Sequence, residues 1–592
     1  MEQIALQKYW ATANKALVGK ILSEFAYEQA FQFQPNGDHL DLHLAKGVSY
    51  SFCGQTNIWG QVRIDPSTIV RTADSEPPSD VTAAQLMRDL QPLLNMSDDA
   101  FAEHLEDLNA TLLGDCKIRL RKEMMTARDL ALLGGEQQQS YFDGHPKFAF
   151  NKGRRGWGLH DLRDYAPEAE KAIQLDWVAV HRDIVQLATN EHVNWQELLS
   201  ASISRDELNE MDRIVAAFNV DIADYHYVPV HPWQWENKVA MLFTQELALK
   251  QMLFIGSFGD AFLPQLSLRT LSNLTRPNSF DIKLPLTVMN TSCYRGIPGK
   301  YILAGPMASD WIDSVFKSDP VLVEKGAQVL QEPAAAFAHQ HDYQQLTDAP
   351  YRYHELLGVI WRESAASKLA PNEHAVLMAA LMESDNQGQP LIAEYIALSG
   401  LSTEAWLTQL FDSVVIPYYH LLCKYGVSLI AHGQNVTLVM ENHQPKRILL
   451  KDFQGDMRLV DQDYPEQASL PDPVKQVTVR LPESLIIHDL QTGHFVTTLR
   501  FISPLLTKLG FSEQEFYRLL GDRIKRYMAE NPEYQHRFTK FDLFKPRILR
   551  IGLNLAKFRH STDSSASRML PDMDDMLDNP LYLAQAKTET KQ

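Results

Sequence analysis

The sequence contains few cysteines, and their spacing supports neither a metal site nor disulfide pairing. Cys53, Cys116, Cys293 and Cys423 lie far apart in a chain of 592 residues, and no CxxC motif occurs. A zinc ribbon needs closely spaced ligand pairs, and a disulfide framework needs many cysteines in a short chain. The pattern is instead typical of reduced thiols in a cytoplasm.

Segments that would direct the chain to a membrane are also missing from the sequence. The N-terminal segment MEQIALQKYWATANKAL has no basic region followed by an apolar core, so it does not predict a signal peptide. No uninterrupted run of about 18 apolar residues occurs, so no membrane span is predicted. We therefore expect a cytoplasmic protein without a membrane partner.

Positive charge is scarce relative to negative charge. The chain has 56 basic and 74 acidic residues, which gives a formal net charge of -18. Nucleic acid and anionic membranes bind cationic faces, so this balance disfavours both as partners. The hydrophobic content of 45% predicts a folded core, and local clusters of basic residues become candidate sites for small anions.

No glycine-rich phosphate loop of the GxGxxG type occurs, yet phosphate-binding side chains gather between residues 267 and 295. The motifs are SLRT, DIKLPL and NTSCYR, and each places a cation near a hydroxyl or on an expected strand. Such pairs are common phosphate cradles, although either arginine alone is more typical of a structural ion pair. The candidate residues are Ser267, Arg269, Thr270, Lys283, Thr291 and Arg295.

A second polar cluster lies about 140 residues further on, in the motifs HGQN and KDFQGD. Asn435 and Asp452 are seventeen residues apart across two expected strands, an arrangement similar to the metal-holding Asn and Asp of protein kinases. Hard oxygen ligands of this kind hold Mg²⁺ on phosphates, so the two clusters together predict a site for ATP and Mg²⁺. The alternative is a β-hairpin with polar turn residues, and the missing VAIK strand excludes a protein kinase.

A third candidate is the segment GHPKFAFNKGRRGWG at residues 144–158. Lys152 and Arg154 flank a glycine there, so they are candidates for binding a carboxylate or a phosphate. A solvated basic loop is the alternative explanation, because runs of charge usually lie on the surface.

The pattern of apolar residues predicts an α+β protein. Helical periodicity runs from the N-terminus to about residue 135, and FDIKLPL at residues 280–286 alternates as a strand that points Asp281 and Lys283 to one face. Residues 320–412, which include the alanine-rich AAAFAHQH, and the last 90 residues up to about 560 are predicted as helix. Strands are expected beside HGQN and before KDFQG.

Seven ordered motifs between residues 144 and 455 resemble those of the NRPS-independent siderophore synthetases, the aerobactin-synthetase superfamily. These motifs are GHPxxxxxKxRxG, VHPWQ, SxRT, KLPL, TSxxR, HxQN and KDFQG. The resemblance implies an ATP-dependent ligase that adenylates a carboxylate and passes the acyl group to an amine. It also implies a homodimer of hand-like chains, with a helical thumb at residues 1–137, fingers at 138–400 and a kinase-like palm at 401–592.

The resemblance assigns a role to each candidate residue. ATP would be held by Ser267, Arg269, Thr270, Lys283, Arg295, His432 and Asn435. Arg295, His432 and Lys283 would also be catalytic, Asp452 and Asn435 would hold Mg²⁺, and the carboxylate substrate would contact His145, Lys152, Arg154 and Thr291.

Two departures from the family pattern bear on the substrate and the metal. Citrate-activating members read GHPxHPxxKxRxG, whereas this chain has Phe148 and Ala149 in place of the second HP. The change predicts the macrocyclic subgroup (desferrioxamine, bisucaberin, putrebactin and alcaligin synthetases), which joins N-hydroxy-N-succinyl-diamine units and closes the ring. The alternatives are a citrate-activating member and a kinase-like phosphotransferase. Gln454 stands where some relatives carry a metal-binding Glu, and its role stays open.

Overall fold

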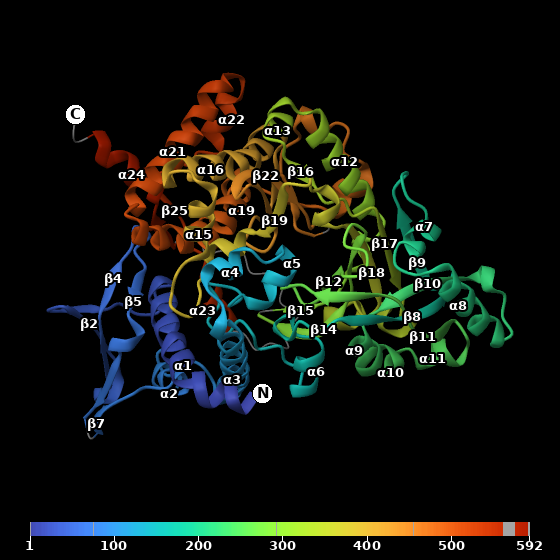
Figure 1. The fold of residues 1–592 in the computed structure, drawn as a ribbon, viewed down its shortest axis with the longest axis horizontal. Coiled ribbons are helices and arrows are strands. Elements are labelled where there is room, and N and C mark those ends of the chain that lie inside the picture. Colours follow the sequence, from blue (N-terminus) through green and yellow to red (C-terminus); the bar gives the residue numbers. More distant parts are fainter. Residues whose placement is uncertain (1, 75, 292, 454, 560–574, 590–592) are drawn as a thin grey trace.

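The computed structural model describes residues 2–74, 76–291, 293–453, 455–559 and 575–589. Helices and strands occur in three lobes that follow the chain only roughly in order (Figure 1), because residues 328–329 and 373–377 join the four-stranded sheet formed with residues 436–450. In Figure 1 the N-terminal lobe (blue) lies at the lower left, the middle of the chain (green) at the right, and most of the C-terminal third (orange and red) at the top. The predicted α+β class is confirmed, while the lobe boundaries at residues 138 and 401 stay predictions.

The N-terminal lobe is built on two long antiparallel helices, α1 (Glu2–Tyr27) and α3 (Asp98–Arg121). α3 begins where the Ser97 side chain accepts a hydrogen bond from the Ala100 N–H, and acidic residues follow in its first turn. Both features stabilise a helix N-terminus. α1 buries one stripe of residues against α3, and this stripe forms the core of the lobe: Leu17, Val18, Ile21, Leu22 and Phe25.

The prediction that this lobe is helical is wrong for residues 34–79. This segment forms a five-stranded antiparallel sheet and a separate hairpin. Runs such as HLDLH and SYSF alternate apolar and polar residues with a period of two, which is the pattern of a strand. The pattern is hard to recognise here because each run is only four or five residues long. The strands of the sheet are β1 (Gln34–Asn36), β2 (His39–His43), β3 (Ser49–Phe52), β6 (Val70–Ala73) and β7 (Glu76–Ser79), and those of the hairpin are β4 (Gly54–Thr56) and β5 (Val62–Ile64).

The middle lobe contains an eight-stranded antiparallel sheet in the order β10-β8-β11-β12-β13-β18-β17-β9. The helices α7 (Trp195–Ser200), α8 (Arg205–Ala217), α10 (Ala240–Leu242) and α11 (Thr244–Ala248) lie toward its outer end (Figure 1). The strands are β8 (Ile173–His181), β9 (Val185–Thr189), β10 (Tyr225–Val230), β11 (Met252–Pro264), β12 (Thr270–Asn273), β13 (Phe280–Lys283), β17 (Ala334–Ala338) and β18 (Gly358–Glu363).

The prediction of helix throughout residues 320–412 is also wrong. The alanine-rich run forms β17, a fully buried strand between β18 and β9. Alanine favours a helix when the chain is considered locally, but tertiary packing overrides this propensity. β18 approaches this strand closely where it begins, because a Cβ at Gly358 would lie 2.8 Å from the Ala336 carbonyl oxygen.

The C-terminal lobe supports the HGQN and KDFQG motifs on two adjacent strands. β21 (Val436–Glu441) and β22 (Gln444–Leu450) pair as an antiparallel hairpin in which Val436 lies opposite Leu450. HGQN therefore ends where β21 begins, and Lys451 and Asp452 follow where β22 ends, at the same edge of the sheet. The helix α16 (Thr403–His420) packs against β22.

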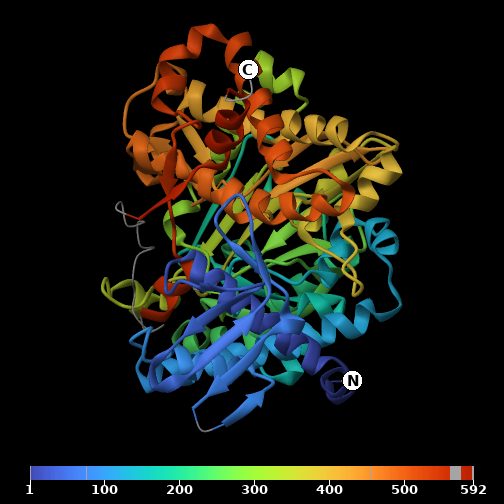
Figure 2. The same cartoon turned by 90° about the vertical axis from the view of Figure 1, so that its left-hand side faces the viewer.

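The chain returns to the N-terminal lobe near its end. After β25 (Arg547–Leu549), a strand within a segment predicted as helix, α23 (Leu553–Arg559) packs beside α1 (Figure 2). The Asn554 amide donates to Glu28 over 2.9 Å, and the buried Arg500 forms a 2.9 Å ion pair with Glu24 of α1. Across the part of the chain that the structure describes, no helix is both long and apolar enough to cross a membrane.

Candidate active site

A direct contact between Lys283 and Asp452 joins the middle and C-terminal lobes. Lys283 ends β13, Asp452 follows β22, and the ammonium nitrogen of Lys283 lies 2.6 Å from the Asp452 carboxylate. Burial alone would raise the pKa of Asp452, but Lys283, Arg362 and Lys451 hold it well below its ordinary value. The Asp452 carboxylate is therefore ionised at neutral pH and surrounded by cations. Lys283 and Asp452 are 169 positions apart in sequence, so only the fold brings them together.

Arg362 on β18 is a central residue that sequence reasoning missed. Its guanidinium lies 3.4 Å from Asp452 and 3.3 Å from Asp281, so it connects two carboxylates. Asp281 and Lys283 lie two residues apart on β13 and share one face, as the alternation predicted, and Asp281 pairs across the ladder with Arg362. An arginine in an apolar stretch (GVIWRE) is the only signal in the sequence for it, because a buried arginine needs an anionic partner.

Arg269 and Arg295 form a second group of cations beside this contact. Burial lowers the pKa of Arg269, and so does the nearby charge of Arg295, whereas Asp452 and Asp456 raise it. Arg295 donates hydrogen bonds to the Asn290 carbonyl oxygen at 3.0 Å and to the Thr291 hydroxyl at 2.9 Å. The two cations therefore lie near each other, and their described hydrogen bonds go to carbonyl and hydroxyl oxygens of the chain, an arrangement suited to binding an anion.

Hydroxyl groups and a glycine position these arginines. The Ser267 hydroxyl accepts a hydrogen bond from the Thr270 N–H at 3.2 Å, which closes the turn that presents Arg269. The Arg269 guanidinium donates to the Gly296 carbonyl oxygen. A Cβ at Gly296 would lie 2.3 Å from the Glu355 carboxylate, so only glycine fits. Burial raises the pKa of Glu355 to about 7, although Arg269 and Lys300 act in the opposite direction.

Several residues of the motifs have a left-handed backbone. Leu268, Thr291 and Asp452 have φ angles of 70°, 60° and 65°, and Arg154 has a φ of 48°. Positive φ is uncommon for residues other than glycine and is most costly for a β-branched residue such as Thr291. Strained conformations of this kind cluster at functional sites, where the surrounding structure holds them.

HGQN forms a turn that presents His432 and Asn435. The His432 Nδ1 accepts a hydrogen bond from the Gln434 N–H at 3.3 Å, so its Nε2 carries the proton. Burial lowers the pKa of His432, although Asp456 and Asp452 raise it, so the imidazole is a neutral donor. The Asn435 amide donates to the Ile430 carbonyl oxygen at 3.2 Å and to the Asp456 carboxylate at 3.4 Å.

The residues around Asp452 fit a magnesium ion that arrives with a triphosphate. No group of three or more His, Cys, Asp or Glu able to hold a metal occurs among the described residues. Mg²⁺ on a nucleotide needs only one or two carboxylates, because phosphate and water oxygens complete its shell. Asp452 and the Asn435 side-chain oxygen have the chemistry of such ligands, and their role stays a prediction, since Asp452 is paired with Lys283 and Arg362 in this structure. Gln454 lies outside the described residues, so its role in metal binding stays open.

His145 lies close to this group, whereas Lys152 and Arg154 bind carboxylates of the chain itself. Burial lowers the pKa of His145 well below its ordinary value, and nearby cations, Arg295 among them, add to this effect. Lys152 lies 2.6 Å from Asp115, and the buried Arg154 forms two hydrogen bonds to Glu168 at 2.6 and 2.9 Å. Their predicted contact with substrate stays a prediction, because a ligand would have to compete with these carboxylates.

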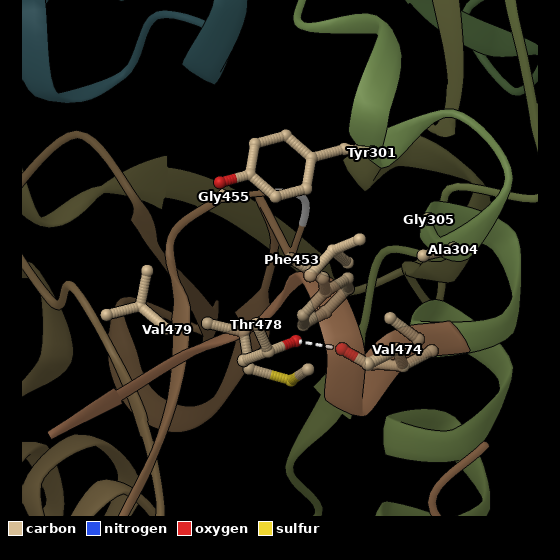
Figure 3. Close-up of a pocket in the computed structure, with 11 residues that line it drawn as sticks. Tyr301, Ala304, Gly305, Phe453, Gly455, Val474, Thr478 and Val479 are labelled. Atoms are coloured by element: carbon tan, nitrogen blue, oxygen red, sulfur yellow. Dashed lines mark hydrogen bonds between the residues drawn. The ribbon is translucent and has the colours of Figure 1, made fainter. Parts of the chain in front are cut away.

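An apolar pocket lies under the loop that follows Asp452 (Figure 3). Tyr301 and Phe453 line it, Val474 and Thr478 lie at its base, and Gly455 packs against the Tyr301 ring. Its volume of about 10 Å³ admits a single water molecule. The pocket therefore does not hold a substrate in this structure, and its walls instead support the loop that carries Asp452.

We expect a buried histidine under HGQN to make stability depend on pH. The His494 Nδ1–H donates to the Ala431 carbonyl oxygen at 2.9 Å, and burial lowers the His494 pKa from 6.5 to about 4. The unfolded chain binds a proton on this imidazole below about pH 6.5, but the native protein does not until about pH 4. The free energy of unfolding therefore decreases as pH falls through this window, by at most about 1.4 kcal/mol per pH unit.

The measurement is the melting temperature at about pH 7.5 and about pH 5. We expect the difference between the two values to be smaller in His494→Gln than in the wild type. His160, whose side chain is 87% exposed, provides the control, since His160→Gln should leave the difference unchanged. An unchanged difference in His494→Gln would contradict the assignment.

Comparison with known proteins identifies the family. The IucA / IucC family matches residues 135–383, and a family described as ferric iron reductase FhuF-like transporter matches residues 404–567. The chain is 69% identical over 587 residues to an aerobactin synthase of Vibrio mimicus, an alignment that covers 99% of both chains. It is 45% identical to the solved structure of the aerobactin synthetase IucC from Klebsiella pneumoniae, with a TM-score of 0.88 and coverage of 98% and 99%.

More distant relatives include enzymes of both predicted subgroups. A putrebactin synthase of Shewanella sp. (strain MR-4) is 29% identical, over 93% of this chain and 87% of its own. An N(2)-citryl-N(6)-acetyl-N(6)-hydroxylysine synthase of Vibrio mimicus is 25% identical, over 54% and 52%. The predicted resemblance and the predicted ligase activity are confirmed. The chain belongs to the IucA/IucC family of NRPS-independent siderophore synthetases, which are ATP-dependent ligases that form amide bonds in siderophore synthesis.

Proposed function

We propose that the protein is a citrate-based siderophore synthetase that adenylates a citryl carboxylate and joins it to an amine. The observation that carries the proposal is the meeting of Lys283 and Arg362 with Asp452 between two lobes. This contact supports the proposal because cations of the kind that bind phosphate lie beside a carboxylate of the kind that binds Mg²⁺. A high identity to an aerobactin synthase supports aerobactin, or a close analogue, as the product.

The first half-reaction activates the acid. A carboxylate oxygen of the substrate attacks the α-phosphorus of ATP, the bond to the β-phosphate oxygen breaks, and pyrophosphate leaves. Arg269, Arg295 and Lys283 offset the negative charge that builds up on the phosphates, and this electrostatic contribution is usually the largest in such sites. Mg²⁺, when bound at Asp452 and Asn435, supplies charge neutralisation of the phosphate oxygens.

The second half-reaction forms the amide. The amine nitrogen attacks the acyl carbon, the bond from that carbon to the AMP oxygen breaks, and the nitrogen loses one proton to solvent or a nearby base. The neutral His432 offers its Nε2–H to the oxygen on which charge develops. Besides this donor, the protein must mainly align the two reactants, and alignment alone supplies a large part of the rate enhancement.

The citrate-derived acid proposed here differs from the N-hydroxy-N-succinyl-diamine that the macrocyclic prediction implies. That prediction relied on Phe148 and Ala149 in place of a second HP motif. The putrebactin synthase is 29% identical to this chain, whereas the aerobactin synthase is 69% identical. A change at two positions weighs less than similarity along the whole chain, so the alternative, a citrate-derived acid, is favoured.

The test offers ATP with each candidate acid and follows exchange of labelled pyrophosphate. We expect exchange with N2-citryl-N6-acetyl-N6-hydroxylysine or citrate, and AMP as the final nucleotide when an amine is added. Exchange only with an N-hydroxy-N-succinyl-diamine would return the assignment to the macrocyclic subgroup. Release of ADP without exchange would instead indicate phosphoryl transfer.

We also propose that the enzyme is a cytoplasmic homodimer. The cytoplasm contains ATP and keeps thiols reduced, and the four cysteines form no disulfide among the described residues. Light scattering of the purified protein at several concentrations measures the oligomeric state, and a mass of one chain at all concentrations would reject the dimer.

A further inference from the structure

A second cavity lies on the N-terminal side of the candidate active site. Its volume is about 330 Å³, which falls within the range of small-molecule sites. α1 forms one wall, the β4–β5 hairpin a second, and residues 500–505 a third. The charged side chains that line it are Lys20, Glu24, Arg63 and Arg500.

Two of these cations have no ion-pair partner among the residues that the structure describes. The Lys20 ammonium donates to the His145 carbonyl oxygen at 3.0 Å, and the exposed Arg63 donates to the Pro504 carbonyl oxygen at 3.3 Å. Glu24, the one carboxylate in the lining, is already held by Arg500 at 2.9 Å and by Gln61 at 2.6 Å. The lining therefore carries a surplus of positive charge.

The carboxylates near Lys20 are also occupied by other cations. Asp115 lies 2.6 Å from Lys152, and Asp143 lies 3.3 Å from Lys122. Burial and the nearby charge of Lys152 together lower the pKa of Lys20 to about 8, although Asp115, Glu24 and Asp143 act in the opposite direction. A largely buried ammonium that faces a cavity without a counter-ion gains from an anionic ligand.

The cavity adjoins the motifs of the active site. Pro146, which follows His145 in the chain, and Met382 both line it. A Cβ at Gly433 of the HGQN motif would lie 2.9 Å from the Met382 methyl group, so this wall of the cavity touches the turn that carries His432. Lys20 contacts the backbone of His145, and His145 in turn lies near His432 and Arg295.

We propose that this cavity binds the acceptor amine, and that Lys20 and Arg63 hold a carboxylate on that amine. The inference rests on the proposed function and specifies its second substrate. ATP and the activated acid require the cations of the middle lobe, so the amine needs a separate approach to the acyl carbon. The cavity lies beside such an approach, because Pro146 next to His145 lines it and its Met382 wall touches the turn that carries His432. The acceptor is accordingly an amino acid or its derivative, and a simple diamine lacks the group that the two cations recognise.

The test compares two acceptors in the full reaction. N6-acetyl-N6-hydroxylysine carries the carboxylate, and its decarboxylated counterpart lacks it. We expect Lys20→Gln and Arg63→Gln each to raise the KM for the first acceptor about 10- to 100-fold, the scale for losing a hydrogen bond to a charged group. The decarboxylated amine should be a poor substrate of the wild type and should respond little to either substitution.

Three controls make the result specific. Lys15 lies on the same helix and pairs with Asp80 at 3.1 Å outside the cavity, so Lys15→Gln should change nothing. Arg63 is exposed, so Arg63→Gln leaves the core intact even if Lys20→Gln disturbs folding. Acid-dependent pyrophosphate exchange, which needs no amine, should be unchanged in all three variants.

Equal losses with both amines, or a raised KM for the acid in the exchange assay, would overturn the proposal. Calorimetric titration of the two amines into the enzyme gives a reading that does not depend on catalysis. If the wild type showed no acid-dependent exchange, the proposed function would fail. The proposal for the cavity would still be supported if the wild type bound the carboxylate-bearing amine selectively and Lys20→Gln abolished this binding.

Discussion

Asp452→Asn is expected to lower the rate of acid-dependent pyrophosphate exchange by about 10³-fold, because it removes both the proposed ligand for Mg²⁺ and the charge that pairs with Lys283 and Arg362. Asparagine tolerates the left-handed backbone at this position, where φ is 65°, so the substitution adds no backbone strain. Exchange at saturating ATP and acid is the measurement, and added Mn²⁺ should not restore it.

A second variant separates this chemical effect from a structural one. Asp452→Asn alone leaves two buried cations near each other without their carboxylate, which should also lower the melting temperature. Lys283→Met combined with Asp452→Asn removes one of these cations, so we expect the melting temperature to recover in part while exchange stays low. Because Lys283 is itself proposed to bind phosphate, the double variant is compared with Lys283→Met alone, and equal exchange in these two variants would show that Asp452 acts only on stability.

The second large effect is expected at Arg295. Arg295→Ala should lower kcat for adenylation by about 10² to 10³-fold, the scale for losing one preorganised donor to the developing charge. Arg295→Lys should recover only part of this loss, because an ammonium cannot reproduce the planar fork of a guanidinium. Single-turnover measurement of acyl-adenylate formation reports this step directly.

Arg276 provides a matched control for this prediction. It lies in the connection between β12 and β13 of the eight-stranded sheet and pairs with Asp260 at 2.7 Å. Arg276→Ala should leave adenylation within about twofold of the wild type, since surface ion pairs contribute little. Near-normal turnover of Arg295→Ala would reject Arg295 as a phosphate-binding residue.

Much of the site could be predicted from the sequence because its residues occur in short polar motifs. Lys283 and Asp452 were assigned to one ligand, and the structure brings them into contact at 2.6 Å. The alternation in FDIKLPL also gave the shared face of Asp281 and Lys283. Arg362 was missed because it stands alone in an apolar strand, and its partners become visible only when β18 pairs with β13.

The fold was less predictable where local propensity and tertiary packing disagree. Residues 334–338 are four alanines and a phenylalanine, which favour a helix in isolation, yet they form a strand at the interior of the eight-stranded sheet. Likewise, the cavity beside Lys20 left no pattern in the sequence. Lys20 and Arg63 stand far from the motifs along the chain, and only the folded arrangement of α1 and the β4–β5 hairpin brings them to His145.

The contacts that close α1 against the end of the chain affect how the enzyme assembles during translation. Glu24 and Arg500 are 476 residues apart, and Glu28 and Asn554 are 526 residues apart. Contacts at such separation form late, because the intervening polypeptide must first be ordered. The N-terminal helix therefore emerges from the ribosome long before its partners exist, and a growing chain gains its second cavity only when synthesis is almost complete.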